Sequence, residues 1–433
     1  MSYTLIAVIG ILIMLVLLFL GMNIGAAMLI VGVVGYAYLV TPKAALGLLQ
    51  TNLYTAGATY SLSVVPLFVL MGEFCYVSGI SQGLFDCANK WLNRLPGSLA
   101  CASLVACAGF GAICGSPAAT AATMGVVALP EMKSKGYDDG LATGCVSMGG
   151  TLGIIIPPST AFILYGVTAG ESIGALFASG ITIGIILTIF CCAVVVVQVV
   201  RKPEMAPSAG QVTWGERLQS LKGILAVAIL FIICIGGIFI GYFTPNEGAA
   251  IGCFIAMLYT ALKRKLTWKN FLFCIEETAK TVGMTFFIVI GATLFGNFLA
   301  ISKLPQTLAN WCAALEVSRY VVLVIILLIY ALLGCIMDAM AMLLLTVPIF
   351  VPVISALGFD TIWFGVLMVL VMELGLITPP VGLNCYVMAG IAKGVPLTTI
   401  FRGSLPFVIS LAAAIAVVVI FPGIATWLPN LLY

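Results

Sequence analysis

The chain has 433 residues, of which 63% are hydrophobic and only 8% carry a charge, and its net charge of +3 is small. An average soluble domain is about 25% charged, so a soluble globule of this size could not cover its core. The composition predicts an all-α polytopic membrane protein. It excludes a soluble enzyme, a secreted module, a nucleic-acid-binding protein and a disordered scaffold. The chain has no histidine, and its 14 cysteines form no C-x-x-C pair, so no transition-metal site is expected.

The distribution of basic residues predicts which loops face the cytoplasm. The first apolar run begins near Leu5 without a preceding basic segment, which favours a first transmembrane helix over a cleaved signal. Short cytoplasmic loops carry the excess of Lys and Arg. Four basic clusters are therefore predicted to be cytoplasmic: Lys90 with Arg94, Lys133 with Lys135, Arg201 and Lys202 with Arg217 and Lys222, and Lys263 to Lys265 with Lys269.

Two amphipathic segments, residues 42–59 and 266–280, are predicted to be helical arms. The second mixes Trp268 and Phe271 with Lys269 and Glu277. That mixture is typical of a helix lying in the membrane interface. We expect the arms to link the outer helices to the core helices of the molecule.

Residues 97–132 form an apolar run that is interrupted by GSPAAT at Gly115–Thr120 and flanked by basic residues at both ends. Each arm is short for a full span, and the interruption carries no charge that would mark a surface turn. This pattern predicts a re-entrant helical hairpin, with two full spans as the alternative. Such hairpin tips are tolerated at membrane depth only where they are buried in protein or line a cavity.

The next apolar run, residues 140–170, contains Pro157 and Pro158 in the middle of GIIIPPST. Proline removes a backbone donor and clashes with the preceding helical turn. The run therefore predicts a broken transmembrane helix. Residues 174–200 are predicted to return to a cytoplasmic loop at 201–222.

The same helix breakers recur 222 positions later in the chain. Pro157–Pro158 aligns with Pro379–Pro380, and Ser116 aligns with Asp338. A second hairpin is expected at about 318–354 and a second broken helix at 361–392, followed by a last span at 403–422.

The flanks of the two hairpins predict their orientation. Basic clusters flank the first hairpin but not the second, which places the two hairpins on opposite sides of the membrane. We therefore predict two inverted-topology repeats, residues 1–200 and 223–433, with both chain termini outside. This architecture is typical of secondary transporters, whose sites lie near the midplane where broken helices meet.

Three carboxylates lie inside apolar runs: Glu73, Asp338 and Glu373. A charge at the centre of a bilayer is costly, so each is a candidate functional residue. Asp338 is the strongest, because it sits at a helix break where it can coordinate a cation or cap the helix that follows. A buried hydrogen-bonding role stays open for Glu373, and a structural contact with a neighbouring helix or subunit stays open for Glu73.

Broken helices expose backbone carbonyls, which together with hydroxyls and one carboxylate suit Na⁺. The predicted Na⁺ ligands are Ser116, Thr120, Thr151, Pro157, Asp338, Glu373, Thr378 and Pro379. The helix N-termini beyond the breaks suit an anionic group. The predicted substrate contacts are Pro158, Ser159, Thr160, Pro380 and Asn384. Small polar residues also serve helix packing, and no cofactor or metal other than Na⁺ as coupling ion is expected.

Four segments resemble the large membrane subunit of the tripartite ATP-independent periplasmic (TRAP) transporters. They are GSPAATAATMG at Gly115–Gly125, GIIIPPST at Gly153–Thr160, MDAMAMLLLTVPIFVP at Met337–Pro352 and ELGLITPPVGLN at Glu373–Asn384. The resemblance extends over essentially the whole chain.

The resemblance implies a sodium-driven importer of a small organic acid, such as a dicarboxylate or sialic acid, in a bacterial inner membrane with both termini periplasmic. It implies two protein partners, a small four-helix membrane subunit and a periplasmic substrate-binding protein. It also implies elevator-type movement of a core against a scaffold.

Two other classes of function are alternatives to such an importer. An intramembrane enzyme needs a metal site, a Ser–Lys or Ser–His dyad, or an aspartate pair. The chain lacks His, its Lys residues lie almost entirely in loops, and its best carboxylate pair, Asp338 and Glu373, lies on separate elements. We therefore predict a transporter and no enzyme. A stand-alone sodium/carboxylate symporter of the same fold, without a binding protein, stays open as the alternative.

Overall fold

The computed structural model describes residues 2–207, 210, 212–314 and 317–433, and across these residues the chain is helical without a strand. Seven helical segments in the described part of the chain are long and apolar enough to cross a membrane, as judged from length and composition. The prediction of an all-α polytopic membrane fold is confirmed.

The described residues form 21 α-helices. In the first half the α-helices are α1 (Tyr3–Phe19), α2 (Ile24–Leu39), α3 (Pro42–Ala58), α4 (Val64–Ser78), α5 (Ile80–Leu92), α6 (Ser98–Cys114), α7 (Pro117–Ser134), α8 (Asp139–Ile155), α9 (Thr160–Ala169) and α10 (Ile173–Arg201). In the second half they are α11 (Trp214–Phe231), α12 (Gly237–Phe239), α13 (Pro245–Leu262), α14 (Trp268–Ile301), α15 (Leu304–Ala314), α16 (Arg319–Gly334), α17 (Ala339–Ala356), α18 (Thr361–Ile377), α19 (Leu383–Ile391), α20 (Leu397–Ile420) and α21 (Gly423–Leu432).

The segment 201–222 is only partly a loop, because its second half belongs to α11. A capping box starts this helix: the Thr213 hydroxyl accepts a hydrogen bond from the Glu216 N–H, and the Glu216 carboxylate accepts one from the Thr213 N–H at 2.8 Å. Arg217 is buried and donates to Asn93 Oδ1 at 2.9 Å, which ties α11 to the end of α5. Residues 208, 209 and 211 of the predicted loop lie outside the described residues.

The two predicted arms differ in the structure. The first coincides with α3, which begins at Pro42. The second is not a separate element, because α14 continues from Trp268 for 34 residues to Ile301. The continuation has a local reason, since residues 281–301 are largely apolar and contain no proline. At 1.5 Å per residue such a helix is about 50 Å long. It is therefore long enough to cross the membrane in addition to forming the predicted arm.

In each half of the chain, both of the interrupted apolar runs form a pair of helices that are separated by a break. α6 and α7 meet at residues 115–116, and α16 and α17 meet across residues 335–338. α8 and α9 are separated by residues 156–159, and α18 and α19 by residues 378–382; the two Pro–Pro bonds in these breaks are cis. The orientation of the two halves relative to the membrane stays a prediction.

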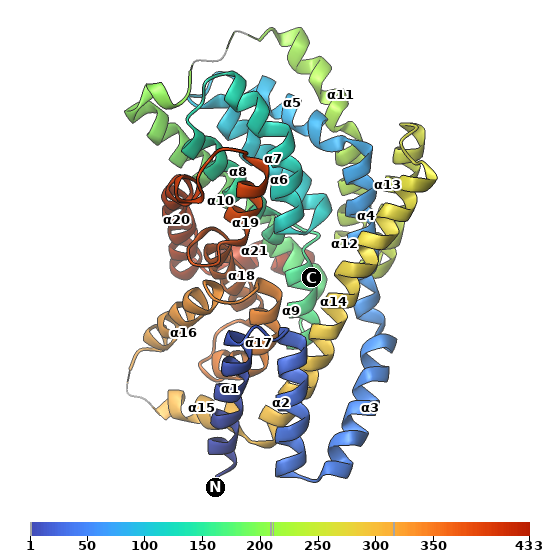
Figure 1. Ribbon diagram of the computed structural model, residues 1–433, viewed down its shortest axis with the longest axis vertical. Helices are drawn as coiled ribbons and strands as arrows, with labels where there is room; N and C mark the ends of the chain where they lie inside the picture. The colour runs from blue at the N-terminus through green and yellow to red at the C-terminus, as the bar shows by residue number, and fades with distance from the viewer. Residues whose placement is uncertain (1, 208–209, 211, 315–316) are drawn as a thin grey trace.

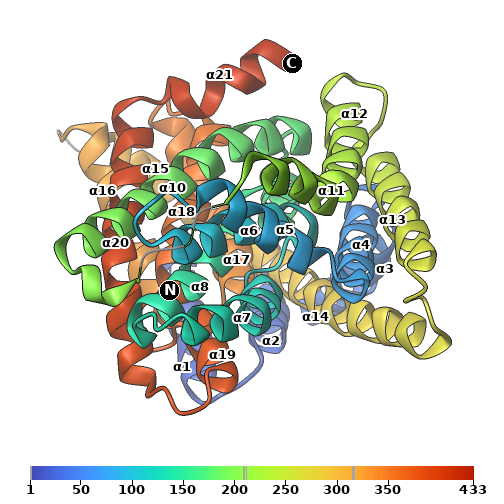
Figure 2. The ribbon, with the colours of Figure 1, turned by 90° about the horizontal axis from the view of Figure 1, so that it is seen from above.

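Two groups of helices lie side by side across the molecule. In Figures 1 and 2, α3, α4, α13 and α14 lie on one side, whereas α10, α16, α18 and α20 lie on the other. The hairpin α6–α7, the helix α8 and the hairpin helix α17 lie between them. α4 packs on α6, and α14 packs on α17, so both helices form a wall against which the hairpins lie.

Candidate functional site

The tip of the first hairpin is shaped by Gly115, Ser116 and Pro117. Gly115 adopts a positive φ of 61° and ends α6, its N–H donating to the Gly111 carbonyl at 2.9 Å. Ser116 then caps α7, with its Oγ accepting from the Ala119 N–H at 3.5 Å, and proline follows at the first helical position. This local chemistry explains why the run breaks where it does.

The first broken helix packs directly on this tip. A Cβ atom added to Gly115 would lie 2.7 Å from the Pro158 carbonyl oxygen, which leaves room only for glycine. The Thr160 hydroxyl donates to the Gly115 carbonyl at 3.1 Å. The buried Ser159 hydroxyl accepts from the Phe162 N–H at 3.2 Å as the cap of α9, and it also donates to the Ile154 carbonyl across the break.

The tip of the second hairpin is built around Asp338. Its Oδ2 atom accepts hydrogen bonds from the backbone N–H groups of Met340 at 3.0 Å and Ala341 at 3.4 Å, so Asp338 is the N-cap of α17. Cys335 at the same tip has its Sγ atom 3.3 Å from the Thr378 hydroxyl, at the start of the second break. Each hairpin tip therefore contacts the broken helix of its own half.

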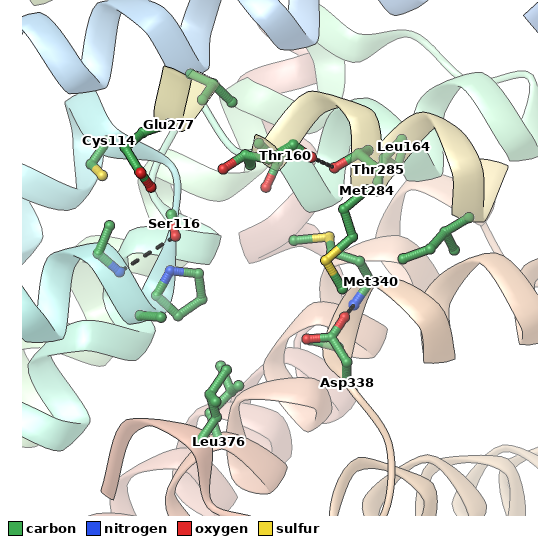
Figure 3. Close-up of a pocket in the computed structure, with 18 of the residues that line it drawn as sticks. Cys114, Ser116, Thr160, Leu164, Glu277, Met284, Thr285, Asp338, Met340 and Leu376 are labelled. Carbon is green, nitrogen blue, oxygen red and sulfur yellow. Dashed lines mark hydrogen bonds between the residues drawn. The ribbon is translucent and has the colours of Figure 1, made fainter. Parts of the chain in front are cut away.

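Both tips open onto one cavity of about 380 Å³. Ser116 and Asp338 reach it from the two hairpins, and Thr160 reaches it from the start of α9 (Figure 3). The opposite wall is formed by α4 and α14, which contribute Glu73 and Glu277. The cavity thus brings together residues from the two hairpins, α9, α4 and α14, which are far apart in the sequence.

The electrostatics of the cavity combine carboxylates with helix N-termini. Three carboxylates line it, those of Glu73, Glu277 and Asp338, and among the described lining residues there is no Lys or Arg. The first turns of α7, α9 and α17 also border it. A helix N-terminus attracts negative charge, whereas the carboxylates attract cations, so the cavity suits a cation and an anion bound together.

Only three of the predicted site residues line this cavity: Ser116, Thr160 and Asp338. Thr120 lies one turn after Ser116 on α7 but is buried, and its hydroxyl has no hydrogen-bond partner among the described residues. Pro157 and Pro158 are buried at the first break, whereas Pro379 and Pro380 are exposed at the second. Thr378 donates its hydroxyl to the Leu374 carbonyl at 2.6 Å.

Three further predicted residues are fully buried and do not line the cavity. Thr151 and Glu373 are both 0% exposed, and the Thr151 hydroxyl hydrogen-bonds Glu373 Oε2 at 3.3 Å, which joins α8 to α18. Asn384 is also buried and donates to the Ser147 carbonyl at 3.0 Å, which joins α19 to α8. In the structure these side chains hold the core helices together.

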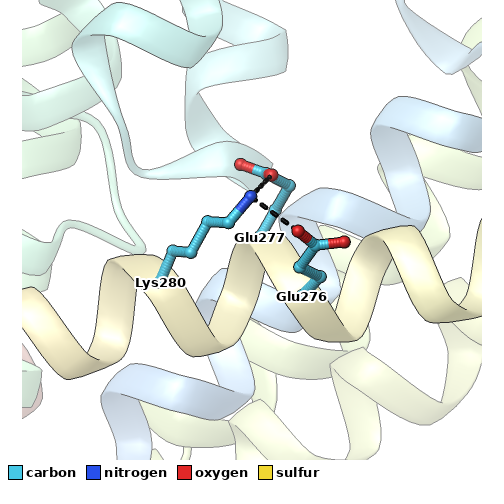
Figure 4. A network of polar contacts seen from close by, with 3 residues as sticks. All are labelled: Glu276, Glu277 and Lys280. Carbon is cyan, nitrogen blue, oxygen red and sulfur yellow. Dashed lines mark hydrogen bonds and ion pairs between the residues drawn. The ribbon is translucent and has the colours of Figure 1, made fainter.

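Sequence reasoning missed the polar face of α14. Glu277, Thr281 and Thr285 line the cavity and are spaced by four residues, so they share one face of the helix. The spacing is visible in the sequence, but the predicted interfacial arm, residues 266–280, includes Glu277 and ends before Thr281 and Thr285. Glu277 shares the ammonium group of Lys280 with Glu276, the Nζ atom lying 2.9 Å from Glu277 and 2.8 Å from Glu276 (Figure 4), so the three side chains keep a net negative charge.

Residues 11–424 match the family described as the tripartite ATP-independent periplasmic transporter, DctM component. The chain belongs to this family. The resemblance seen in the sequence motifs is thereby confirmed, and the chain is a TRAP transporter large permease subunit, which is a transport protein in a multi-pass membrane family.

Named relatives support the assignment over nearly the full length. The chain is 34% identical to the C4-dicarboxylate TRAP transporter large permease protein DctM of Pseudomonas aeruginosa, over 88% of this chain and 89% of the relative. It is 32% identical to the sialic acid TRAP transporter large permease protein SiaM of Vibrio cholerae, over 96% of both chains. It is 30% identical to the 2,3-diketo-L-gulonate TRAP transporter large permease protein YiaN of Escherichia coli, over 87% and 88%.

Solved structures of more distant transporters share the fold. The YdaH transporter of Alcanivorax borkumensis matches with a TM-score of 0.57 at 16% identity, covering 87% of this chain and 89% of that one. MtrF of Neisseria gonorrhoeae matches with a TM-score of 0.55 at 13% identity, covering 96% and 95%. At this identity the likeness concerns the fold alone.

Proposed function

We propose that this TRAP large permease couples the entry of Na⁺ to the import of a small organic acid across a bacterial inner membrane. The observation that carries the proposal is the cavity in which Ser116 and Asp338, at the tips of the two hairpins, meet the start of α9. Transporters of this general design bind substrate and coupling ions where discontinuous helices meet.

Asp338 is the proposed anchor of a Na⁺ site. Asp338 lines the cavity, and its Oδ2 atom is engaged by two backbone N–H groups, whereas no hydrogen bond among the described residues reaches its other carboxylate oxygen. A carboxylate held in place by a cap can ligate a cation without reorganising. Ser116 lines the same cavity and would supply a further oxygen ligand. The carbonyls at Pro157 and Pro379 and the side chains of Thr120, Thr151, Thr378 and Glu373 are the candidates outside the cavity lining.

The substrate is proposed to be an organic acid anion whose negative group is held by N–H groups and hydroxyls. The N-termini of α7, α9 and α17 border the cavity, and a helix N-terminus binds anionic groups. Thr160 and Ser159 at the start of α9, with Pro158, Pro380 and Asn384, are the candidate contacts. The named relatives carry C4-dicarboxylates, sialic acid and 2,3-diketo-L-gulonate, so the proposed class is a small hydroxylated or dicarboxylic acid.

The family membership supports two protein partners, a small four-helix membrane subunit and a periplasmic binding protein that delivers the acid. We also propose that the hairpins and broken helices move as a unit along the wall formed by α4 and α14. The polar residues Glu277, Thr281 and Thr285 give that wall a hydrophilic face on the cavity side. The stand-alone symporter is the less favoured reading, because the relatives are subunits of TRAP systems.

Uptake by the reconstituted transporter should require both a Na⁺ gradient and the binding protein. The reason is that three carboxylates and no basic side chain among the described residues line the cavity, so an anion needs accompanying cations there. The measurement is uptake of labelled succinate, sialic acid and 2,3-diketogulonate into proteoliposomes that contain both membrane subunits. Equal rates under Na⁺ and K⁺ gradients would refute the coupling, and uptake without the binding protein would support the stand-alone alternative.

Both chain termini should lie in the periplasm. The basic clusters at Lys90, Lys133, Arg201 and Lys263 place four connections in the cytoplasm, which leaves an outward last span. The test is a C-terminal alkaline phosphatase fusion, which is active only after export, compared with a C-terminal green fluorescent protein fusion. A fluorescent and phosphatase-negative C-terminus would overturn the inverted orientation of the two halves.

A further inference from the structure

A second crevice, of about 310 Å³, lies between α11 and α13 and shares no lining residue with the candidate transport site. Its walls are almost entirely apolar, with Leu225 and Ile229 contributed by α11 and Leu258 by α13. These three side chains are exposed, to 58%, 43% and 48%. In a membrane-spanning protein such a face is open to the acyl chains of the bilayer.

The polar lining of this crevice is confined to one end. Lys222 on α11 and Lys263 at the end of α13 both line it, with Tyr259 beside them. α11 and α13 are joined through residues 232–244 at the other end of the pair, so the two lysines fall at the same mouth. No Asp or Glu lines the crevice. Every ion pair among the described residues involves Lys280, so neither Lys222 nor Lys263 is paired with a carboxylate there.

Two unneutralised ammonium groups at the mouth of an apolar crevice match one kind of amphiphile. We propose that this crevice binds an anionic phospholipid, with the headgroup phosphate between Lys222 and Lys263 and an acyl chain along Leu225, Ile229 and Leu258. Basic pockets between transmembrane helices bind anionic headgroups in this way. The headgroup phosphate relieves the repulsion between the two lysines, and the acyl chain covers the exposed side chains of Leu225, Ile229 and Leu258.

Charge favours this occupant over a zwitterionic phospholipid, and the apolar walls favour it over free phosphate. An inserted helix of a partner subunit is the alternative that the test below decides. A zwitterionic phospholipid brings its own ammonium group to a mouth that already holds two positive charges. Free phosphate meets the lysines but leaves the apolar part of the crevice uncovered.

The test is the melting temperature of the purified full chain in detergent, followed with a thiol-reactive dye that reports its buried free cysteines. Added palmitoyl-oleoyl phosphatidylglycerol should raise the melting temperature, because a ligand that binds only the folded state stabilises it. Phosphatidylcholine with the same chains and inorganic phosphate should leave it nearly unchanged. Native mass spectrometry should retain one phosphatidylglycerol per chain.

Variants separate this site from general attraction to a basic protein. The double variant Lys222→Gln/Lys263→Gln should lose most of the rise and the retained lipid, and Leu225→Trp should lose them with both lysines intact, because the ring fills the crevice. The matched control Lys202→Gln/Lys269→Gln removes two exposed lysines that do not line the crevice, and it should keep the rise.

Three outcomes would overturn the proposal. They are an unchanged rise in the double variant at Lys222 and Lys263, an equal loss in the control at Lys202 and Lys269, and an equal rise with inorganic phosphate. If addition of the small membrane subunit alone displaces the lipid and protects the crevice, a protein partner is its occupant instead.

Discussion

Asp338→Asn should abolish Na⁺-driven uptake, or raise the Na⁺ concentration for half-maximal uptake more than tenfold, while the melting temperature stays unchanged. Asparagine keeps the side-chain oxygen that accepts from the Met340 and Ala341 N–H groups, so the cap of α17 survives. It removes the formal charge, and a charge about 4 Å from Na⁺ is worth about 4 kcal/mol at an effective dielectric constant of 20. The measurement is a Na⁺ titration of uptake in proteoliposomes.

Asp360→Asn is the matched control for this prediction. Asp360 also caps a helix, with its Oδ1 atom accepting from the Trp363 N–H at 2.7 Å, but it does not line the cavity. Its replacement should leave both stability and Na⁺ dependence near the wild-type values. If Asp338→Asn transports with an unchanged Na⁺ dependence, Asp338 is a helix cap and the proposed ion site has to be sought elsewhere.

Gly144→Ala should strongly destabilise the fold, seen as a large drop in melting temperature and in the yield of folded protein. α8 and α20 cross at this glycine, and an added Cβ atom would lie 2.2 Å from the Gly403 carbonyl oxygen. Small residues let helices approach closely in membranes. Overpacking of a core commonly costs about 1–3 kcal/mol, and here the opposing atom is backbone, which cannot rotate away.

Gly283→Ala is the control with the opposite expected sign. Gly283 is exposed on α14, and an added Cβ atom would meet nothing within 4 Å. Alanine is favoured over glycine inside a helix by about 1 kcal/mol, so this variant should be as stable as the wild type or more so. A Gly144→Ala variant that melts like wild type would show that α8 and α20 separate easily, and that the packing of the core is looser than the structure indicates.

Several local features of the fold followed from residue chemistry that acts over a few positions. The all-α membrane class follows from long uncharged apolar runs, because only a helix satisfies its own backbone in lipid. Proline lacks the N–H that a helix needs, so the residues around Pro157 and Pro379 leave the helix. The start of α11 was harder to predict. It depends on the capping box between Thr213 and Glu216, and the charged sequence around that box is equally compatible with a loop.

The residues that share the candidate site were only partly predictable. Ser116 and Thr120 lie one turn apart on α7 and carry the same kind of group, but only Ser116 borders the cavity. Which of the two faces the opening depends on how α7 packs against α8, and no local pattern records this. Glu73 and Glu277 belong to helices widely separated in the chain, and they share one wall because α4 packs on α14.

The sequence by itself determined the membrane class, the positions of the helix breaks and the family, because these depend on composition, on proline and glycine and on continuous motifs. The tertiary structure alone decided which oxygen atoms meet. It placed Asp338 and Ser116 on one cavity, and it buried Thr151 against Glu373 as a contact between α8 and α18. The physical reason is that the site is formed by the packing of separate helices. Close contacts between helices, such as that of Gly144 with Gly403, decide which face of each helix points toward the site.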